Sequence, residues 1–141
     1  VEEAVAHGID VAEFPTTMEA AKASHDAGLA VLMGAPNVVR GGSHSGNISA
    51  QALVDAGVLD ILSSDYIPFS LMQAVFALSR GENAISLPRA VALVSASPAK
   101  AAGLMDRGQI APGRRGDLVR VELIDEHPVV RTVWSEGVRV I

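Results

Sequence analysis

One pattern recurs along the chain: apolar runs alternate with helical stretches. Gly8, Gly28 and Gly57 each close a helical stretch directly before an apolar run. Glycine suits these positions because it accepts the left-handed backbone at a helix end. The apolar runs lie at 9–14, 29–33 and 58–65, and the helical stretches that follow them lie at 18–27, 49–56 and 68–79. The expected N-caps are Thr16 or Thr17 for the first of these helices and Asn47 or Ser49 for the second.

This alternation of strands and helices predicts an α/β fold with a parallel sheet covered by helices. Right-handed crossovers then build either an open doubly wound sheet or part of a (β/α)8 barrel. The composition agrees, since 49% of the 141 residues are hydrophobic but only 4% are aromatic. The core is therefore expected to consist of Ala, Val, Leu and Ile.

The composition also excludes several classes of partner. A formal net charge of −5 argues against a general nucleic-acid binder. There is no cysteine, which excludes disulfides and thiolate sites. No apolar run reaches the ~18 residues that a membrane-spanning helix needs. We therefore expect a soluble, cytoplasmic protein without a membrane or nucleic-acid partner.

The pattern of apolar and polar residues divides the chain into two parts. Residues 1–107 carry the strand–helix alternation, with two further short helices expected at 87–94 and 97–103. Residues 108–141 begin with a turn-rich stretch and continue with alternating apolar and polar residues, which predict a small antiparallel β unit. About 35 residues cannot close a core of their own, so this unit is expected to pack on something else.

The second apolar run is expected to lead into a loop, residues 34–47, that is rich in Gly, Ser, Asn, Arg and His. Successive backbone amides at Gly41 and Gly42 can form an anion-binding concavity. Arg40 adds a cationic fork suited to phosphate oxygens, and His44 adds a group that binds metal or moves a proton. In the alternative interpretation, the glycines only allow tight turns and Ser and Asn cap the next helix.

Polar residues stand at the carboxyl ends of all three predicted strands. They are Glu13, the segment 37–44 and Asp65. In parallel sheets of either architecture, ligands bind at these ends, so the three connections predict one site. A solvated rim is the alternative. For Asp65 the alternative is a cap for the helix that begins near Pro68.

Two features resemble the amidohydrolase superfamily: Asp65 at the end of a strand, and the segment 108–119. That segment reads Gly-Gln-Ile-Ala-Pro-Gly-Arg-Arg-Gly-Asp-Leu-Val, with Gly116 where the family usually has Ala. The resemblance implies strands six to eight of a metal-dependent (β/α)8 TIM barrel in residues 1–107. Residues 108–141 then form part of a small β-sandwich.

Segments 12–17, 33–47 and 63–66 narrow the resemblance to the PhnM type of phosphonate-metabolism enzyme. That family hydrolyses α-D-ribose 1-methylphosphonate 5-triphosphate to the 5-phosphate and diphosphate, beside the carbon–phosphorus lyase pathway. The likeness implies a phosphorylated ribose substrate and a divalent metal, expected to be zinc. A homo-oligomer is expected separately, because strands cut out of a barrel have unpaired edges.

The same resemblance suggests roles for individual residues. Asp65 is the expected base and a metal ligand, Glu13 is a second candidate ligand, and His44 binds metal, binds phosphate or protonates the leaving diphosphate. The expected substrate-binding residues are Asn37, Arg40, Gly41, Gly42, Ser43 and Ser45.

One departure from the family pattern limits these expectations. The superfamily carries a His-x-His pair after its first strand, and this chain has none. We therefore expect the chain to be a C-terminal fragment that is inactive alone. Two other functions stay open: a cyclic amide hydrolase of the dihydroorotase type, and a non-catalytic fragment that acts by association through unpaired sheet edges.

Overall fold

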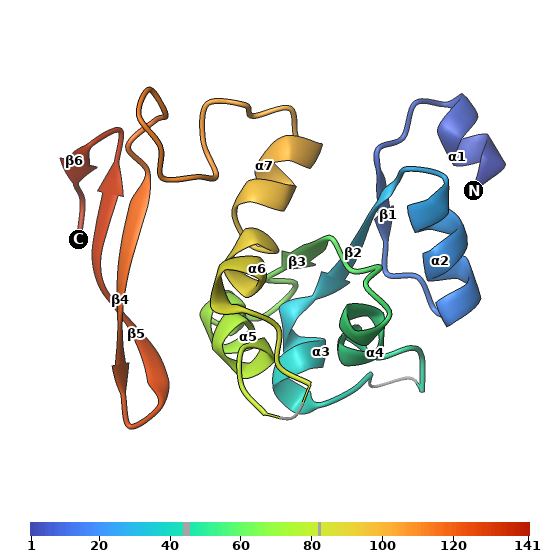
Figure 1. The fold of residues 1–141 in the computed structure, drawn as a ribbon, viewed down its shortest axis with the longest axis horizontal. Coiled ribbons are helices and arrows are strands. Elements are labelled where there is room, and N and C mark those ends of the chain that lie inside the picture. The colour runs from blue at the N-terminus through green and yellow to red at the C-terminus, as the bar shows by residue number, and fades with distance from the viewer. Residues whose placement is uncertain (44–45, 82) are drawn as a thin grey trace.

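The computed structural model describes residues 1–43, 46–81 and 83–141. It shows a mixed α/β chain with two small sheets (Figure 1). The helices are α1 (Glu2–Ala6), α2 (Met18–Asp26), α3 (Ala35–Arg40), α4 (Ala50–Asp55), α5 (Ser70–Leu78), α6 (Leu87–Ala92) and α7 (Ala96–Ala101). The strands are β1 (Val11–Glu13), β2 (Ala30–Gly34), β3 (Ile61–Ser63), β4 (Leu118–Ile124), β5 (His127–Ser135) and β6 (Val138–Arg139).

The first sheet is parallel, as the sequence predicted, and its strands lie in the order β1-β2-β3. Val31 and Met33 of β2 are buried in one hydrophobic cluster with Leu62, which pairs with Met33 across the sheet. Helices α4 and α5 complete that cluster through residues such as Leu53 and Leu78. Burial of such aliphatic side chains contributes roughly 1.5–3 kcal/mol each, so this packing is what fixes the sheet.

The expected helix caps are confirmed where a side chain reaches the backbone. Thr17 Oγ1 accepts a hydrogen bond from the amide of Ala20 at the start of α2, at 3.1 Å. Ser49 Oγ accepts from the amide of Ala52 at the start of α4, also at 3.1 Å. Each bond satisfies one amide that the first helical turn leaves without a partner.

A short helix, α3, replaces part of the irregular connection predicted at 34–47. Its first turn contains Pro36, whose fixed φ suits a helix start. It ends at Gly41, where φ is +76° and a side chain would be strained. The prediction of a continuous glycine-rich loop was therefore wrong for residues 35–40, because the proline signal was outweighed by the local Gly and Ser content.

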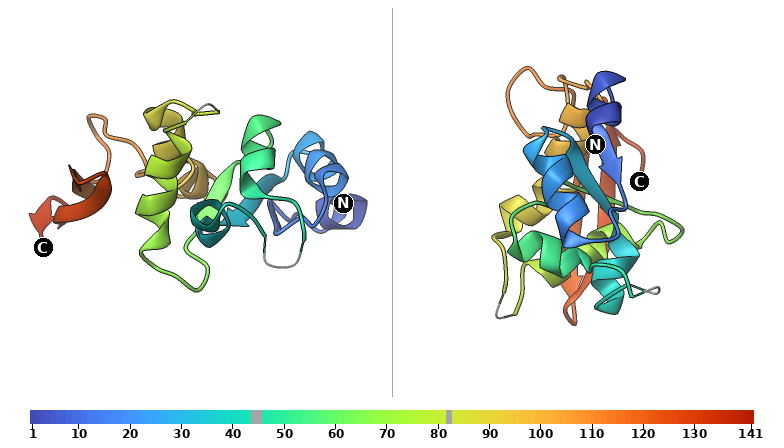
Figure 2. Two further views of the ribbon diagram at one scale, coloured as in Figure 1. Left: turned by 90° about the horizontal axis from the view of Figure 1, so that it is seen from below. Right: turned by 90° about the vertical axis from the view of Figure 1, so that its right-hand side faces the viewer.

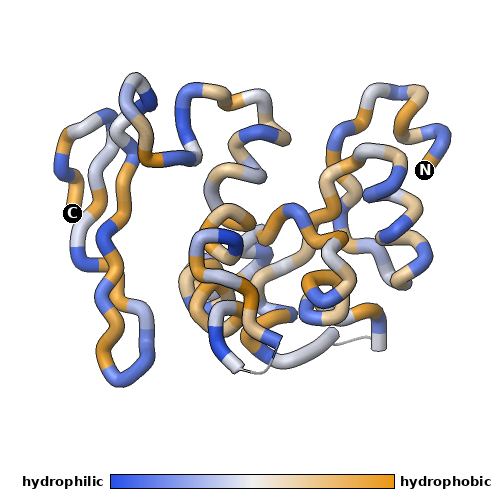
Figure 3. The backbone as a smooth tube through the Cα atoms, in the orientation of Figure 1, coloured by the Kyte–Doolittle hydropathy of each residue, from blue (hydrophilic) through white to orange (hydrophobic). Residues whose placement is uncertain are grey.

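The second sheet is antiparallel, with strand order β4-β5-β6, as predicted. Hydrophobic and hydrophilic residues alternate along the middle of β4 (Figure 3). Figures 1 and 2 show this sheet at one end of the molecule and α1 at the other. A hydrogen bond connects this sheet to the segment that follows α5: Nη1 of Arg80 donates to the backbone oxygen of Glu126, between β4 and β5, at 3.0 Å.

Ion pairs fix the segment that enters the antiparallel sheet. Arg115 Nε lies 2.8 Å from Asp117 Oδ2, and Arg115 Nη2 lies 3.0 Å from Glu136. The amide of Glu136 also donates to Asp117, and this bond together with Arg115 lowers the pKa of the Asp117 carboxyl. Arg115 thus stabilises the segment that enters the antiparallel sheet.

Gly116 and Gly137 pack against each other in the same segment. A Cβ added at Gly116 would lie 2.9 Å from the backbone nitrogen of Gly137, and the amide of Gly137 donates to the oxygen of Gly116 at 2.8 Å. This close approach leaves no room for a side chain at position 116.

Asp60 joins two strands at the amino end of the parallel sheet. Its Oδ2 accepts from the amide of Val31 at 2.9 Å and lies 3.1 Å from Nδ1 of His25. The amide of Asp60 in turn donates to the oxygen of Val31 at 3.0 Å. These bonds hold β2 and the start of β3 in register.

Among the described residues, no helix is long and apolar enough to cross a membrane.

Candidate functional site

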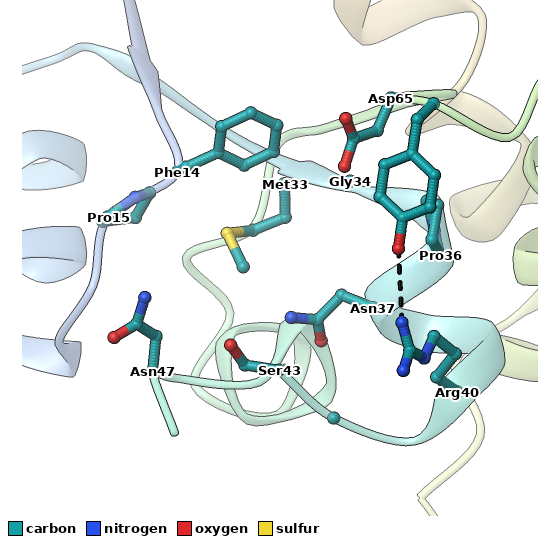
Figure 4. A pocket seen from close by; sticks show the side chains of 12 residues that line it. Phe14, Pro15, Met33, Gly34, Pro36, Asn37, Arg40, Ser43, Asn47 and Asp65 are labelled. Atoms are coloured by element: carbon teal, nitrogen blue, oxygen red, sulfur yellow. Dashed lines mark hydrogen bonds between the residues drawn. The ribbon is translucent and has the colours of Figure 1, made fainter. Parts of the chain in front are cut away.

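A hollow of about 250 Å³ opens at the carboxyl ends of the parallel strands. Its lining comes from the connections that follow β1, β2 and β3, as the sequence predicted (Figure 4). The lining residues are Phe14, Pro15, Met33, Gly34, Pro36, Asn37, Arg40, Gly42, Ser43, Asn47, Asp65 and Tyr66. The structure thus brings together five of the predicted site residues: Asn37, Arg40, Gly42, Ser43 and Asp65.

Asp65 lies in a turn directly after β3 and does not cap the following helix. Helix α5 begins at Ser70, its N-cap is Phe69, and no side chain bonds to its first amides. Within the described residues the Asp65 carboxylate has no hydrogen-bond or ion-pair partner. Its φ is +49°, an uncommon conformation for a residue with a side chain. A strained residue with an open carboxylate at a pocket is typical of a functional position.

Gly34 makes room for this carboxylate. A Cβ at Gly34 would lie 3.0 Å from Oδ2 of Asp65 and 3.2 Å from its Cβ. The φ of Gly34 is −76°, which any residue can adopt, so the requirement for glycine here comes from space alone. Gly34 ends β2 and starts the connection to α3, which means that the two strand ends meet at this contact.

Arg40 is the last residue of α3, and its side chain contacts the connection that follows β3. Its Nη1 donates to the hydroxyl of Tyr66 at 3.3 Å (Figure 4). Tyr66 directly follows Asp65, and 60% of its surface is exposed. The pair therefore forms part of an accessible, positively charged wall beside the carboxylate.

Asn37 has a structural contact in addition to its place in the pocket. Its Oδ1 accepts a hydrogen bond from the amide of Ala50, at 2.8 Å, in the first turn of α4. The amide nitrogen of the same side chain is left to face the pocket (Figure 4). Asn37 thus ties α3 to α4 and can offer the pocket donors only.

The two glycines after α3 do not offer their amides to a ligand. The amide of Gly41 donates to the oxygen of Val38, and the amide of Gly42 donates to the oxygen of Asn37. Both bonds close the C-terminus of α3, so the expected anion-binding concavity at these amides is absent. Gly42 lines the pocket and gives it space, whereas Gly41 lies outside the lining.

Glu13, a predicted metal ligand, is not brought into the described pocket. Glu13 ends β1 and is exposed, outside the lining. His44 and Ser45 lie outside the described residues. Across 1–43, 46–81 and 83–141 no group of three or more His, Cys, Asp or Glu side chains comes together. The described residues therefore do not form a metal site by themselves, and Asp65 is the one carboxylate that they bring to the pocket.

Seven lining residues were not predicted as site residues, and three of these carry an aromatic or amide side chain: Phe14, Asn47 and Tyr66. Phe14 has a φ of +52° and follows β1 as Asp65 follows β3. Its ring is opposite Asp65 in the pocket (Figure 4). A signal did exist, because the chain has only three Phe and one Tyr and two of these four lie next to predicted strand ends.

A second hollow, of about 680 Å³, lies at the opposite end of the parallel sheet. It is lined by residues that include Asp10, His25, Asp60 and Lys100. His25 and Asp60 contact each other there. This hollow is remote from Asp65, Arg40 and Tyr66, so we place the candidate active site at the carboxyl end.

Several known proteins are similar to this chain in sequence or in fold. A family model described as "Amidohydrolase family" matches residues 4–141. The chain is 54% identical over 134 residues to an α-D-ribose 1-methylphosphonate 5-triphosphate diphosphatase of Escherichia coli (strain K12), covering 94% of the chain and 35% of that protein. It is 33% identical over 100 residues to an imidazolonepropionase of Deinococcus deserti, covering 62% of the chain and 25% of that protein.

Among solved structures, an amidohydrolase from Thermotoga maritima MSB8 matches with a TM-score of 0.58 and 17% identity. The match covers 93% of this chain and 43% of that one, and it concerns the fold alone. The chain therefore spans about a third or less of the curated relatives' length, 35% and 25%. Because the family model covers nearly the whole sequence, this chain belongs to the amidohydrolase family.

Proposed function

We propose that the full-length protein containing this chain hydrolyses α-D-ribose 1-methylphosphonate 5-triphosphate to the 5-phosphate and diphosphate. The 54% identity to an E. coli protein of that name supports the substrate. The observation that carries the proposal is the pocket that holds Asp65 and Arg40 together. Phosphoanhydride hydrolysis needs a base that accepts the proton of the attacking water, and a carboxylate can do this. It also needs a positive group that neutralises the phosphate oxygens, and a guanidinium can do this.

In this proposal Asp65 accepts the proton of the attacking water. The water oxygen forms a bond to the phosphorus next to the ribose, the bond from that phosphorus to the bridging oxygen breaks, and diphosphate leaves with the electron pair. Arg40 neutralises oxygens of the triphosphate, and Asn37 and Ser43 supply polar contacts. These assignments rest on the lining of the pocket and on the chemistry of each side chain.

The family also implies a divalent metal, expected to be zinc. When bound, such an ion lowers the pKa of a water ligand towards neutrality. Since the described residues do not form a metal site by themselves, we assign no step to it here.

We also propose that residues 1–107 are strands six to eight of a (β/α)8 barrel with their helices, and that residues 108–141 are part of a β-sandwich. Sequential order of the three parallel strands supports the barrel, because an open doubly wound sheet changes direction at a switch point. Exposed apolar residues such as Val119 and Val138 on the antiparallel sheet support a homo-oligomer or further covering chain. A cytoplasmic location completes the proposal.

The test is a substrate comparison with the purified full-length protein. We expect the ribose triphosphate to yield diphosphate and the 5-phosphate. Phosphorus NMR detects both products. Dihydroorotate and imidazolonepropionate are the comparison compounds, because a cyclic amide substrate is the alternative and one relative is named imidazolonepropionase. Turnover of either cyclic compound without diphosphate release would overturn the proposal.

A further inference from the structure

Arg40 differs from several other arginines of the chain in what it contacts. Arg107, Arg115 and Arg131 each pair with a carboxylate at 2.7–2.8 Å. Arg40, by contrast, forms no ion pair within the part of the chain that the structure describes, and its contact is with a neutral hydroxyl. A guanidinium held by a neutral partner keeps its whole charge for an anionic ligand.

Tyr66 is placed to fix the direction of that charge. Arg40 ends α3, where a long side chain would ordinarily turn back to the carbonyls of the helix end. Instead its Nη1 donates a hydrogen bond, at 3.3 Å, to the hydroxyl of Tyr66, which lies 26 residues further along the chain. One bond to Nη1 leaves four of the five guanidinium donors for other oxygens, and a phenol can accept and donate at the same time.

We propose that Tyr66 is a positioning residue that holds Arg40 in place for the polyphosphate chain of the ligand. This inference rests on the proposed function and adds the residue that makes Arg40 effective. A free arginine side chain loses rotamer freedom when it binds an anion, and a preformed contact removes part of that cost. The ligand class is a linear polyphosphate, since its successive charged groups can use the remaining donors.

The experiment measures binding of inorganic triphosphate to the full-length protein by calorimetry, together with kcat and KM for the ribose triphosphate. Tyr66→Phe removes the hydroxyl and keeps the ring. Loss of one such hydrogen bond is expected to weaken triphosphate binding by roughly 3- to 10-fold and to raise KM similarly, with kcat little changed. Phe69→Leu is the matched control, because Phe69 is exposed on the same connection and lies outside the pocket lining.

A second variant separates positioning from a merely structural role. If Tyr66 acts through Arg40, then Tyr66→Phe has no further effect on triphosphate binding in an Arg40→Gln background. Additive losses in the double variant, unchanged binding in Tyr66→Phe, or no triphosphate binding by the wild-type protein would each overturn the inference. Triphosphate binding that depends on both residues, without diphosphate release from the ribose triphosphate, would reject the proposed function and leave the positioning role standing.

Discussion

Gly34 and Asp65 are packed so closely that one methyl group on Gly34 would lie 3.0 Å from the Oδ2 atom of Asp65. The contact joins the end of β2 to the turn after β3. The connections that follow these two strands carry most of the polar pocket residues. Any side chain at position 34 must therefore displace the carboxylate that we propose as the base.

The first prediction is that Gly34→Ala lowers both stability and activity. Overpacking of this kind typically costs ~1–3 kcal/mol of unfolding free energy, and a displaced Asp65 lowers kcat. Asp65→Gly removes both atoms of the clash and suits the φ of +49°, so Gly34→Ala should cost little stability in that background. Urea unfolding of the two single variants and the double variant checks this; equal costs in both backgrounds would contradict it.

The second prediction concerns Asp65→Asn in the full-length protein. Asparagine keeps the size of the side chain but cannot accept a proton, and loss of a general base typically costs ~10² to 10⁴ in rate. Since Asp65 does not cap α5, thermal stability should stay close to that of the wild type. The measurements are diphosphate release and the melting temperature. A variant that keeps more than about a tenth of the wild-type rate would rule out the role.

The third prediction separates the two faces of Asn37. Asn37→Ala removes the acceptor for the Ala50 amide and should cost about 1 kcal/mol of stability. Asn37→Asp keeps that acceptor but replaces the donors that face the pocket with negative charge. It should therefore retain stability while weakening triphosphate binding. Thermal melts and calorimetry on both variants decide the matter, and a strongly destabilised Asn37→Asp would be the contrary result.

The fourth prediction is acid sensitivity at the entrance to the antiparallel sheet. The pKa values of Asp106 and Asp117 are lowered from 3.8 by bonds from Arg107 and from the Glu136 amide, respectively. On acidification the unfolded chain takes up protons first, so this contribution is complete above pH 3.8 and is lost as the pH falls through the folded pKa values. Asp117→Asn should therefore flatten the fall in stability below about pH 4.

The control for this prediction is Glu122→Gln, which removes the exposed pair with Arg131 on the same sheet. Exposed pairs of this kind contribute little, so its unfolding curve at neutral pH should resemble that of the wild type. If Asp117→Asn and Glu122→Gln changed the acid limb of the stability profile equally, the specific role of Asp117 would be rejected.

Much of the architecture was predictable because it follows from periodicity and punctuation. The helices closed by Gly28 and Gly57 lie within the predicted ranges. Of the parallel strands, β2 extends one residue beyond its predicted range, to Gly34, and β3 covers only Ile61–Ser63 of the apolar run at 58–65. The strand is shorter because its pairing with β2 ends at Ser63, where the chain turns towards Asp65. Helix α3 was missed although Pro36 signalled it.

The site was predictable only as a set of residue types near strand ends. Asp65 and Arg40 were found because their charges stand out in the sequence. The engagement of the Gly41 and Gly42 amides, the bond from Ala50 to Asn37 and the contact of Arg40 with Tyr66 were not predictable. Each depends on where α3 ends and how it packs on neighbouring elements, which a pattern of residues does not specify.

The bonds of Asp60 have a consequence for how this chain can diverge. They lock β2 to β3 at the amino end of the strands, whereas the pocket is built from connections at the carboxyl end. Register and ligand chemistry are thus encoded in separate segments. Loops grafted after β1, β2 or β3 would meet a scaffold whose alignment is already set, so new substrate preferences can arise here by exchange of short connections.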